Sequence, residues 1–368
     1  MPGIPGHATP EGTGRFATAS VVQRKIPSGH FRRGPGGLSY SSFGLGTYLG
    51  DPDSATDALV EEAAAVCLTS GRVNVLDTAI NYRFQKAERS IGRAVARVIR
   101  GGAVEREAVF VATKNGYLAP DADARIAPGE WIEEKLIRSG VLKRSDIVDG
   151  SHAMSVRFLE DQLERSRVNL GLETIDLLYL HNAPEAQIPV VGRSTFLQRL
   201  GDAFGFFEKK RRAGALRSYG LATWDSLRVP RSDPGFLSLE EAVGVARTVG
   251  GDGHGFQFVQ FPFNPVMPEA TALRNQSVAG ERLSLFEAAR RLGIGCFTSV
   301  PLLQGQLARE GEHADKLSSA LTALQFARSA PGTLGPMVGQ KHPEHLAENL
   351  RLAEQAPWDE TAFRRWIG

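Results

Sequence analysis

The chain has 368 residues, 42% of them hydrophobic, and a formal net charge of +2 at pH 7. This length allows one large domain or several small ones, and the near-neutral charge argues against a protein that binds nucleic acid through a basic surface. No apolar run approaches the roughly 18 to 20 residues of a membrane span, and the amino end lacks the apolar core of a signal peptide. We therefore expect a soluble, cytoplasmic protein in which the two cysteines, Cys67 and Cys296, are buried thiols.

Residues 1–38 are rich in Gly, Pro, Ser and Arg and contain a single acid, Glu11. This composition predicts a flexible N-terminal tail. A targeting peptide is the alternative, but no amphipathic helix is evident. Residues 39–368 are predicted to form a single domain.

Beyond the tail, short apolar runs alternate with stretches in which apolar residues recur at helical spacing. The runs predict eight strands, at residues 43–47, 73–77, 109–114, 175–181, 219–223, 256–261, 294–300 and 336–339. The helical stretches predict helices at residues 56–70, 156–170, 196–212, 239–248, 282–292, 317–330 and 343–354, and one that follows Tyr82 and runs to Arg100. The apolar character of the strands indicates burial on both faces.

Eight strands that alternate with eight helices predict a parallel (β/α)8 TIM barrel. A doubly wound sheet is the alternative, but no GxGxxG turn follows an early strand. In such a barrel the active site lies at the carboxyl ends of the strands. Three connections on that face, 117–151, 226–238 and 262–280, exceed the usual length of roughly two to six residues. We interpret them as walls or lids of a substrate pocket; plain surface loops are the alternative.

Titratable residues mark the ends of three predicted strands. Asp77 ends the second strand, Lys114 the third and His181 the fourth, and Tyr82 follows Asp77 in the loop. If a hydride is to reach a carbonyl carbon, the oxygen needs a proton, and a phenol with a pKa of about 10 is a poor donor near neutrality. A neighbouring ammonium lowers the pKa of the phenol, a carboxylate holds the ammonium, and an imidazole orients the substrate oxygen. Each residue alone also fits a structural role, but together they predict carbonyl reduction with Tyr82 as the acid.

At these residues the sequence resembles the aldo-keto reductase family. The motifs that carry the resemblance are FGLGTY, LDTAINY, VFVATK, LERSRVNLGLETIDLLYLH, VQFPFN and PEHLAENL, and they extend over residues 43–350. The resemblance implies a (β/α)8 barrel, NAD(P)(H)-dependent oxidoreductase chemistry and a catalytic tetrad of Asp77, Tyr82, Lys114 and His181. The separation of Lys114 and His181 along the chain exceeds the family's usual one, and the connection 117–151 accounts for the difference.

The resemblance also implies a binding site for NADPH or NADP+, with NADH as an alternative. The cofactor-binding residues that it predicts are Gly46, Thr47, Asn182, Thr223, Gln260, Ser299, Leu302, Gln304, Gly305, Gly339, Lys341, His345, Glu348 and Asn349. The nicotinamide end departs from the family pattern, because Ala222 and Thr223 stand at the usual Ser-Asn pair and Ser299 stands at the usual stacking aromatic. NADPH is favoured because Lys341, with His342 and His345, can pair with a 2′-phosphate.

Tyr48, Trp131 and Trp224 are predicted to line the substrate pocket, where the family often uses aromatic side chains. The predicted activity is the NAD(P)H-dependent reduction of a small aldehyde or ketone. Two alternatives stay open: a sugar or alcohol dehydrogenase that acts mainly in the oxidative direction, and a regulatory subunit that binds the cofactor with little turnover. No nucleic acid or membrane is expected as a partner. No metal ion is expected either, because His342 and His345 lack a third ligand. The sequence does not indicate an oligomeric state.

Overall fold

In the computed structural model, which describes residues 3–308 and 318–367, eight parallel strands close into a barrel. In sequence order the barrel strands are β3 (Gly44–Gly46), β4 (Val75–Asp77), β5 (Phe110–Asn115), β6 (Ile175–His181), β7 (Leu216–Ala222), β8 (Phe256–Pro262), β11 (Gly295–Ser299) and β12 (Thr333–Gly339). Each pairs with the next, and β12 closes the circle by pairing in parallel with β3. The predicted (β/α)8 barrel is confirmed.

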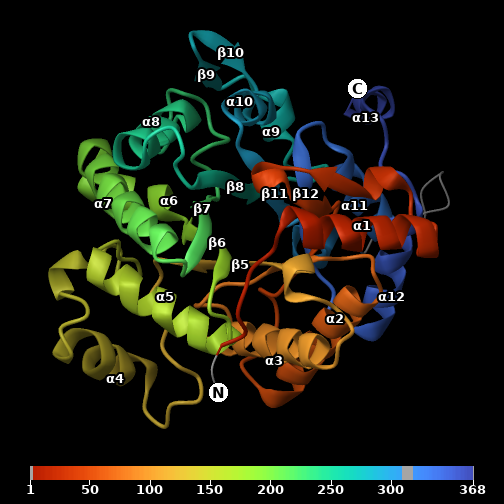
Figure 1. Ribbon diagram of the computed structural model, residues 1–368. Helices are drawn as coiled ribbons and strands as arrows, with labels where there is room; N and C mark the ends of the chain where they lie inside the picture. The colour runs from red at the N-terminus through yellow and green to blue at the C-terminus, as the bar shows by residue number, and fades with distance from the viewer. Residues whose placement is uncertain (1–2, 309–317, 368) are drawn as a thin grey trace.

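Helices surround the barrel on the outside, as Figure 1 shows. The helices between the strands are α2 (Ser54–Thr69), α3 (Lys86–Arg100), α5 (Val156–Leu170), α7 (Arg193–Arg212), α8 (Leu239–Gly250), α10 (Leu285–Leu292), α11 (Ser319–Ser329) and α12 (Pro343–Arg351). Most bounds agree with the prediction to within a few residues. Helix α10 starts later than expected because Ser284 and Glu287 form a capping box, and residues 281–283 form strand β10 (Glu281–Leu283) instead. Leu317, the predicted start of α11, lies outside the described residues. No described helix has the length and apolar character needed to cross a membrane.

The amino-terminal mouth of the barrel is filled by a hairpin of β1 (Phe31–Arg33) and β2 (Ser39–Ser41). Tyr40 of this hairpin is fully buried, and its ring makes edge-on contacts with Phe110 and Phe297, at centroid distances of 5.0 and 5.6 Å. Large aromatic side chains in such contacts fill the interior. The barrel is therefore a packed core at this end, and the carboxyl ends of the strands are left for a binding site.

The N-terminal segment differs from the flexible tail expected over residues 1–38. It contains helix α1 (Pro10–Arg24), which begins with Thr9 as its N-cap. The helix packs so closely on the barrel that a side chain at Gly12 would come within 2.5 Å of the backbone of Glu107. The buried positions of α1 are Gly12, Thr13 and Ser20, which are small or polar. Because no apolar residues mark its buried face, the helix escapes a search for apolar periodicity.

The two long connections after β7 and β8 are linked to each other. Arg228 in the first forms an ion pair with Glu269 in the second, where α9 (Glu269–Ala272) begins, at 2.6 Å. The buried amide of Asn275, next to β9 (Gln276–Val278), donates to the carbonyl oxygens of Leu227 and Val229 at 2.9 and 2.8 Å. These bonds cross-brace the two connections, which supports the interpretation of walls over that of mobile lids.

The buried carboxylate of Asp176 accepts hydrogen bonds from both the N-terminal segment and the barrel. Its removal therefore tests whether the segment is packed on the barrel. Its Oδ1 accepts from the backbone N–H of Ala8 at 2.7 Å, and its Oδ2 accepts from Arg106 at 2.8 Å and from the N–H of Val111 at 2.9 Å. Removing one partner of a buried ion pair costs about 3–5 kcal/mol. We expect Asp176→Ala to lower the free energy of unfolding in urea by that amount.

The control is Asp161→Ala, which removes the partner of Arg165 in a half-exposed pair on α5. Such pairs contribute about 0.3–0.5 kcal/mol. Equal losses for the two variants would contradict a packed N-terminal segment.

Candidate active site

The structure brings Asp77, Tyr82, Lys114 and His181 together at the carboxyl ends of β4, β5 and β6. Lys114 Nζ lies 2.5 Å from Asp77 Oδ2 and donates to the carbonyl oxygen of Thr78 at 2.9 Å. The same ammonium lies 4.9 Å from the centroid of the Tyr82 ring, and that ring lies edge-on to the His181 ring at 5.6 Å. A carboxylate, an ammonium, a phenol and an imidazole thus form one continuous cluster.

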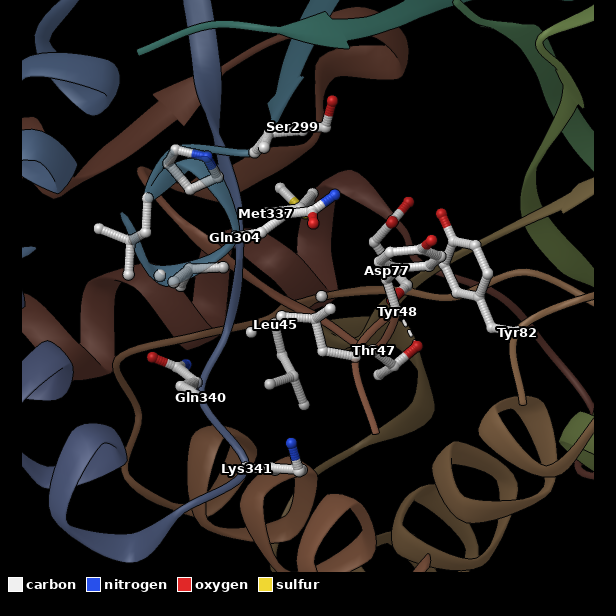
Figure 2. Close-up of a pocket in the computed structure, with 18 of the residues that line it drawn as sticks. Leu45, Thr47, Tyr48, Asp77, Tyr82, Ser299, Gln304, Met337, Gln340 and Lys341 are labelled. Atoms are coloured by element: carbon white, nitrogen blue, oxygen red, sulfur yellow. Dashed lines mark hydrogen bonds between the residues drawn. The ribbon is translucent and has the colours of Figure 1, made fainter. Parts of the chain in front are cut away.

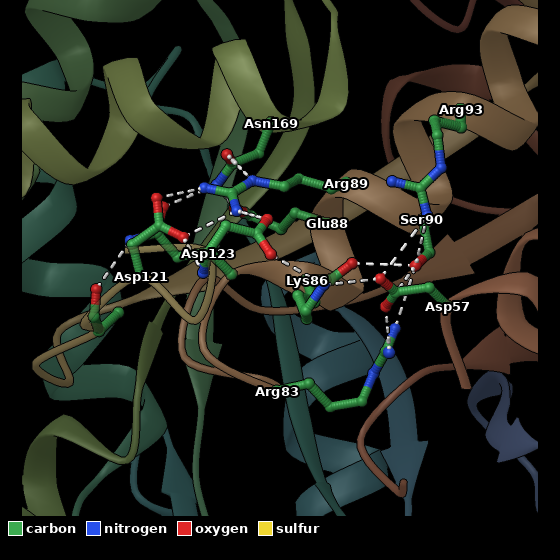
Figure 3. A network of polar contacts seen from close by, with 12 residues as sticks. Asp57, Arg83, Lys86, Glu88, Arg89, Ser90, Arg93, Asp121, Asp123 and Asn169 are labelled. Atoms are coloured by element: carbon green, nitrogen blue, oxygen red, sulfur yellow. Dashed lines mark hydrogen bonds and ion pairs between the residues drawn. The ribbon is translucent and has the colours of Figure 1, made fainter. Parts of the chain in front are cut away.

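The loop that holds Tyr82 has an unusual backbone. Arg83, Phe84 and Gln85 follow it with φ angles of 49°, 53° and 74°, a region that side chains other than glycine rarely adopt. Such a conformation persists only where its surroundings hold it. Buried Arg83 donates to Asp57 Oδ1 at 2.6 Å, and Lys86 donates to Asp57 Oδ2 at 2.9 Å, so the loop is anchored to α2 (Figure 3).

A second anchor joins the helix after this loop to the start of the long connection 117–151. Arg89 of α3 forms ion pairs with Asp121 at 2.6 Å and with Asp123 at 2.5 Å, and its Nε donates to Asn169 at 3.1 Å (Figure 3). Networks of this kind hold geometry more firmly than isolated surface pairs. The position of Tyr82 therefore depends on contacts from α2, α5 and the connection after β5.

Burial controls the ionisation of the cluster. It raises the pKa of Tyr82 well above its ordinary value, and the nearby Asp77 carboxylate adds to this rise. Burial also lowers the pKa of Lys114, against the attraction of Asp77, and lowers the pKa of His181 well below its ordinary value with help from the charge of Lys114. We expected the Lys114 ammonium to lower the pKa of Tyr82; in this structure that ammonium is directed to Asp77 and Thr78, and burial prevails. At neutral pH, Tyr82 is a phenol and His181 a neutral imidazole.

A cavity of about 680 Å³ opens above the cluster. In Figure 2, Asp77, Tyr48 and Tyr82 lie on one side of it and Ser299, Gln304 and Gln340 on the other. Every residue that the sequence analysis assigned to the cofactor lines this cavity, and so do Tyr48 and Trp224, which it assigned to the substrate. The structure therefore places these residues together, from β3, β8, β11 and β12, from the loops that follow β3, β6, β7, β11 and β12, and from α12.

Trp131 was predicted to line the substrate pocket, but it does not line this cavity. Its side chain is buried in α4 (Pro128–Ile132), with the guanidinium of Arg165 5.1 Å from its ring centroid. Leu136 and Leu142 are buried with it. The long connection after β5 contributes to the core of the protein through these side chains, and its tryptophan packs there instead of facing a ligand.

The nicotinamide end of the predicted site carries one polar side chain that already has a hydrogen-bond partner, Gln260, and one that has none among the described residues, Thr223. Gln260 donates its amide N–H to Asp77 Oδ1 at 3.0 Å, and its backbone carbonyl accepts from the N–H of Thr223 at 2.8 Å. The hydroxyl of Thr223 is buried and has no hydrogen-bond partner among the described residues. A buried hydroxyl without a partner is costly unless a ligand or water satisfies it. Thr223 can therefore bond a polar group that enters the cavity.

The opposite end of the cavity suits phosphate groups. In the turn after β11, Val300, Leu303, Gln304 and Gly305 all have positive φ, between 47° and 90°, a backbone conformation that occurs in anion-binding turns. Within this turn the N–H groups of Leu303 and Gly305 donate to the carbonyl oxygens of Val300 and Leu302, at 3.1 and 2.9 Å. The cavity also reaches Lys341 and the first turn of α12, where unpaired backbone N–H groups favour anions. Among the described residues, no three His, Cys, Asp or Glu side chains are grouped so as to hold a metal ion.

Comparison with known proteins agrees with this arrangement. The model of the aldo/keto reductase family matches residues 42–317, which is most of the chain. The chain belongs to the aldo/keto reductase family. No curated protein matches the chain.

Solved structures of aldo-keto reductases share the fold. An aldo/keto reductase from Klebsiella pneumoniae, solved in complex with NADP and acetate, is 16% identical, with a TM-score of 0.59 over 92% of this chain and 94% of that one. The holo form of an aldo-keto reductase from Bacillus halodurans is 17% identical, with a TM-score of 0.60 over the same shares. These likenesses confirm the barrel, and the family makes the protein an oxidoreductase.

Three further residues contact His181 and were not found from the sequence. Asn81 Oδ1 lies 3.3 Å from His181 Nδ1, the Tyr117 ring lies edge-on to the His181 ring at 5.1 Å, and His152 Nε2 lies 3.0 Å from the carbonyl oxygen of His181. Asn81 directly precedes Tyr82 in the NY pair, which is a signal that could have found it. Tyr117 and His152 stand at the two ends of the long connection, and nothing local in the sequence marks either.

The ionisation of the cluster predicts the pH dependence of catalysis. For carbonyl reduction with Tyr82 as its acid, the raised pKa of Tyr82 predicts a rate that stays level between about pH 6 and pH 9, with no break near 6.5 from His181. Alcohol oxidation needs the phenolate and should rise with pH across this range. The measurement is kcat/KM in both directions, with circular dichroism at each pH as a control for folding. A titration near pH 6.5 in the reduction profile would contradict the neutral His181.

Proposed function

We propose that the protein is an NADPH-dependent reductase that converts an aldehyde or ketone to an alcohol. The observation that carries this proposal is the cluster of Asp77, Tyr82, Lys114 and His181 at one end of a cavity whose other end suits phosphate groups. A proton donor and a dinucleotide-sized cleft are the two things that such a reaction needs from the protein. Aldo-keto reductases from Klebsiella pneumoniae have been solved in complex with NADP and with NADPH, which supports the choice of cofactor.

The residues of the cluster take distinct roles in this proposal. NADPH held in the cavity would provide a hydride for the carbonyl carbon. Tyr82 gives its phenolic proton to the carbonyl oxygen, so that its O–H bond breaks as the substrate's O–H bond forms. The phenolate that remains is stabilised by the Lys114 ammonium, whose charge is balanced by Asp77. His181, neutral and edge-on to Tyr82, hydrogen-bonds the substrate oxygen and orients it.

The lining residues divide the cavity between parts of the cofactor. Thr223, Gln260 and Asn182 would hold the nicotinamide amide, although Ala222 and Ser299 offer it less than the family's usual residues. Leu302, Gln304 and Gly305 would hold the pyrophosphate, and Gly46, Thr47 and Gly339 would line the cleft. The adenosine end would be held by Glu348 and Asn349 on α12, with Lys341 and His345 at the 2′-phosphate. Tyr48 and Trp224 would contact the substrate.

The close contacts of the cluster favour turnover over a purely regulatory role. A regulatory subunit would have no need for Lys114 and His181 both to lie against Tyr82 beside the cavity. Oxidation of a sugar or another alcohol would use the same groups in reverse, so it remains the second candidate within the same chemistry. The preference between the phosphorylated and unphosphorylated cofactor is the property that separates the two.

The general acid is tested by Tyr82→Phe. Loss of a positioned acid typically lowers rates by about 10²–10⁴-fold, so we expect kcat for aldehyde reduction to fall at least about a hundredfold, while NADPH binding followed by tryptophan fluorescence stays nearly unchanged. The control is Tyr40→Phe, which removes a phenol bonded to the carbonyl oxygen of Pro35 at the far end of the barrel. Substantial residual reduction by Tyr82→Phe would remove the basis of the proposed function.

The cofactor preference is tested by Lys341→Ala. A hydrogen bond to a charged group contributes about 1.5–3 kcal/mol, so the variant should bind NADPH at least about tenfold more weakly and bind NADH as the wild type does. Lys135→Ala, an exposed lysine in the connection after β5, is the matched control for loss of a positive charge. Equal affinity of the wild type for NADH and NADPH would instead favour the oxidative dehydrogenase.

A further inference from the structure

The long connection after β5 leaves the barrel and returns to it at the same place. Tyr117 at its start and His152 at its end form an antiparallel bridge. The N–H of Leu118 donates to the carbonyl oxygen of Ser151 at 2.7 Å, and the N–H of Ala153 donates to that of Gly116 at 2.9 Å. The base of the connection is therefore a short ladder beside the end of β6, where His181 lies.

This base is shaped to hold Tyr117 and His152 close together. Gly116 has a φ of 119°, and a Cβ there would lie 2.5 Å from His152 Nε2, so only glycine admits the imidazole. Gln162 of α5, which is buried, accepts from the N–H of Gly116 at 2.8 Å and donates to the carbonyl oxygen of Tyr117 at 2.7 Å. Both peptide groups that flank the turn are thus fixed by one side chain.

The contacts of His152 define its tautomer. Arg199 can only donate, and it donates to Gln187 Oε1 at 2.6 Å, so the NH2 group of Gln187 faces His152 Nδ1 at 3.0 Å. Nδ1 therefore accepts, and the hydrogen is on Nε2, which donates to the carbonyl oxygen of His181 at 3.0 Å. His152 is fully buried, and burial lowers its pKa to about 4, which agrees with a neutral ring. His152 thus restrains the backbone of His181 through its carbonyl oxygen.

Tyr117 lies between the two imidazoles and faces the cavity. Its ring is edge-on to His152 at 5.2 Å and to His181 at 5.1 Å, with interplanar angles of 88° and 87°. Its hydroxyl oxygen accepts from Asn182 Nδ2 at 3.3 Å, which leaves the hydroxyl hydrogen for another acceptor. Tyr82 and Tyr117 therefore contact the same imidazole, and both line the cavity.

We propose that Tyr117 is a specificity-determining residue whose hydroxyl donates to an oxygen beside the reacting carbonyl, and that His152 is the positioning residue for Tyr117 and His181. The inference rests on the proposed reductase function and narrows its substrate to carbonyl compounds with a neighbouring hydroxyl or ether oxygen. While Tyr82 and His181 bond the carbonyl oxygen, the hydroxyl of Tyr117 bonds the second oxygen. The connection 117–151, by which this chain exceeds the usual family length, thereby supplies substrate recognition.

The test compares glyceraldehyde with propanal, which has the same carbon chain without the hydroxyls. One neutral hydrogen bond contributes about 0.5–1.5 kcal/mol, so Tyr117→Phe should lower kcat/KM for glyceraldehyde by about two- to tenfold, mainly through KM, and leave propanal unchanged. Binding of both aldehydes to the NADP+ complex, followed by tryptophan fluorescence, should show the same loss of preference. Tyr40→Phe is the control. The inference is overturned if Tyr117→Phe leaves the ratio of kcat/KM for glyceraldehyde to kcat/KM for propanal unchanged, or if the wild type does not prefer glyceraldehyde.

His152 is tested by a pair of variants. His152→Leu removes the donor to His181 and should lower kcat for both aldehydes, whereas His152→Gln keeps an N–H in a similar place and should restore much of the activity. Equal loss in both variants, or no loss in either, overturns the positioning role. Failure of the proposed function would look different, because the wild type would then bind no NADPH and reduce neither aldehyde.

Discussion

The ion pair between Asp77 and Lys114 is the constraint on which the site depends. Both side chains are almost fully buried, and two charges removed from water are costly unless their remaining hydrogen-bonding capacity is used. In this pair the remaining capacity is used, because Asp77 also accepts from Gln260 and Lys114 also donates to the carbonyl oxygen of Thr78. Because β4 and β5 are adjacent and parallel, the pair also joins the ends of neighbouring strands. The Lys114 ammonium is thus held by the barrel itself.

The loops around the pair are held by side chains that lie outside the site. The positive φ angles after Tyr82 are held by Asp57 of α2, and the loop with Trp224 is held by Glu185, whose Oε1 accepts from the backbone N–H groups of Trp224, Asp225 and Ser226 at 2.8, 2.9 and 2.9 Å. A carboxylate that accepts three N–H groups fixes a turn firmly. The pocket walls are thus preorganised, and a substrate meets them with little further ordering to do.

The sequence predicted the barrel well because its strands are buried on both faces, so each appears as an apolar run bounded by turns. The strand-end residues Asp77, Lys114 and His181 were predictable for the same reason, since the position of a strand end follows from where its apolar run stops. Helix α1 was not predictable in this way, because Gly12 and Ser20 pack by being small. Trp131 was misplaced because an aromatic residue in a long connection packs in a core as readily as it faces a ligand.

The pKa of Tyr82 and the contacts of His181 could not be predicted from the sequence. The effect of Lys114 on Tyr82 was predicted from proximity alone, but the pKa of a phenol depends on burial as well, and the degree of burial is a property of the folded structure. The partners of His181 are similarly distant along the chain: Asn81 precedes it by 100 positions and His152 by 29. No periodicity connects such residues, and only the pairing of β4, β5 and β6 in the sheet brings the segments that carry them together.

The connection after β5 and the N-terminal segment show how additions to a barrel can acquire different roles. The N-terminal segment packs at the amino end of the barrel, where Ala8 completes the hydrogen bonds of Asp176, and its role there is to stabilise the fold. The connection 117–151 begins three residues beyond Lys114, so its first residues lie beside the cluster of Asp77, Tyr82, Lys114 and His181. Its ends contribute Tyr117 and His152, and its interior, with Trp131 buried, provides the apolar packing that keeps those ends in place. Position along the barrel axis thus determines whether added residues lie beside the cavity or at the opposite end of the barrel.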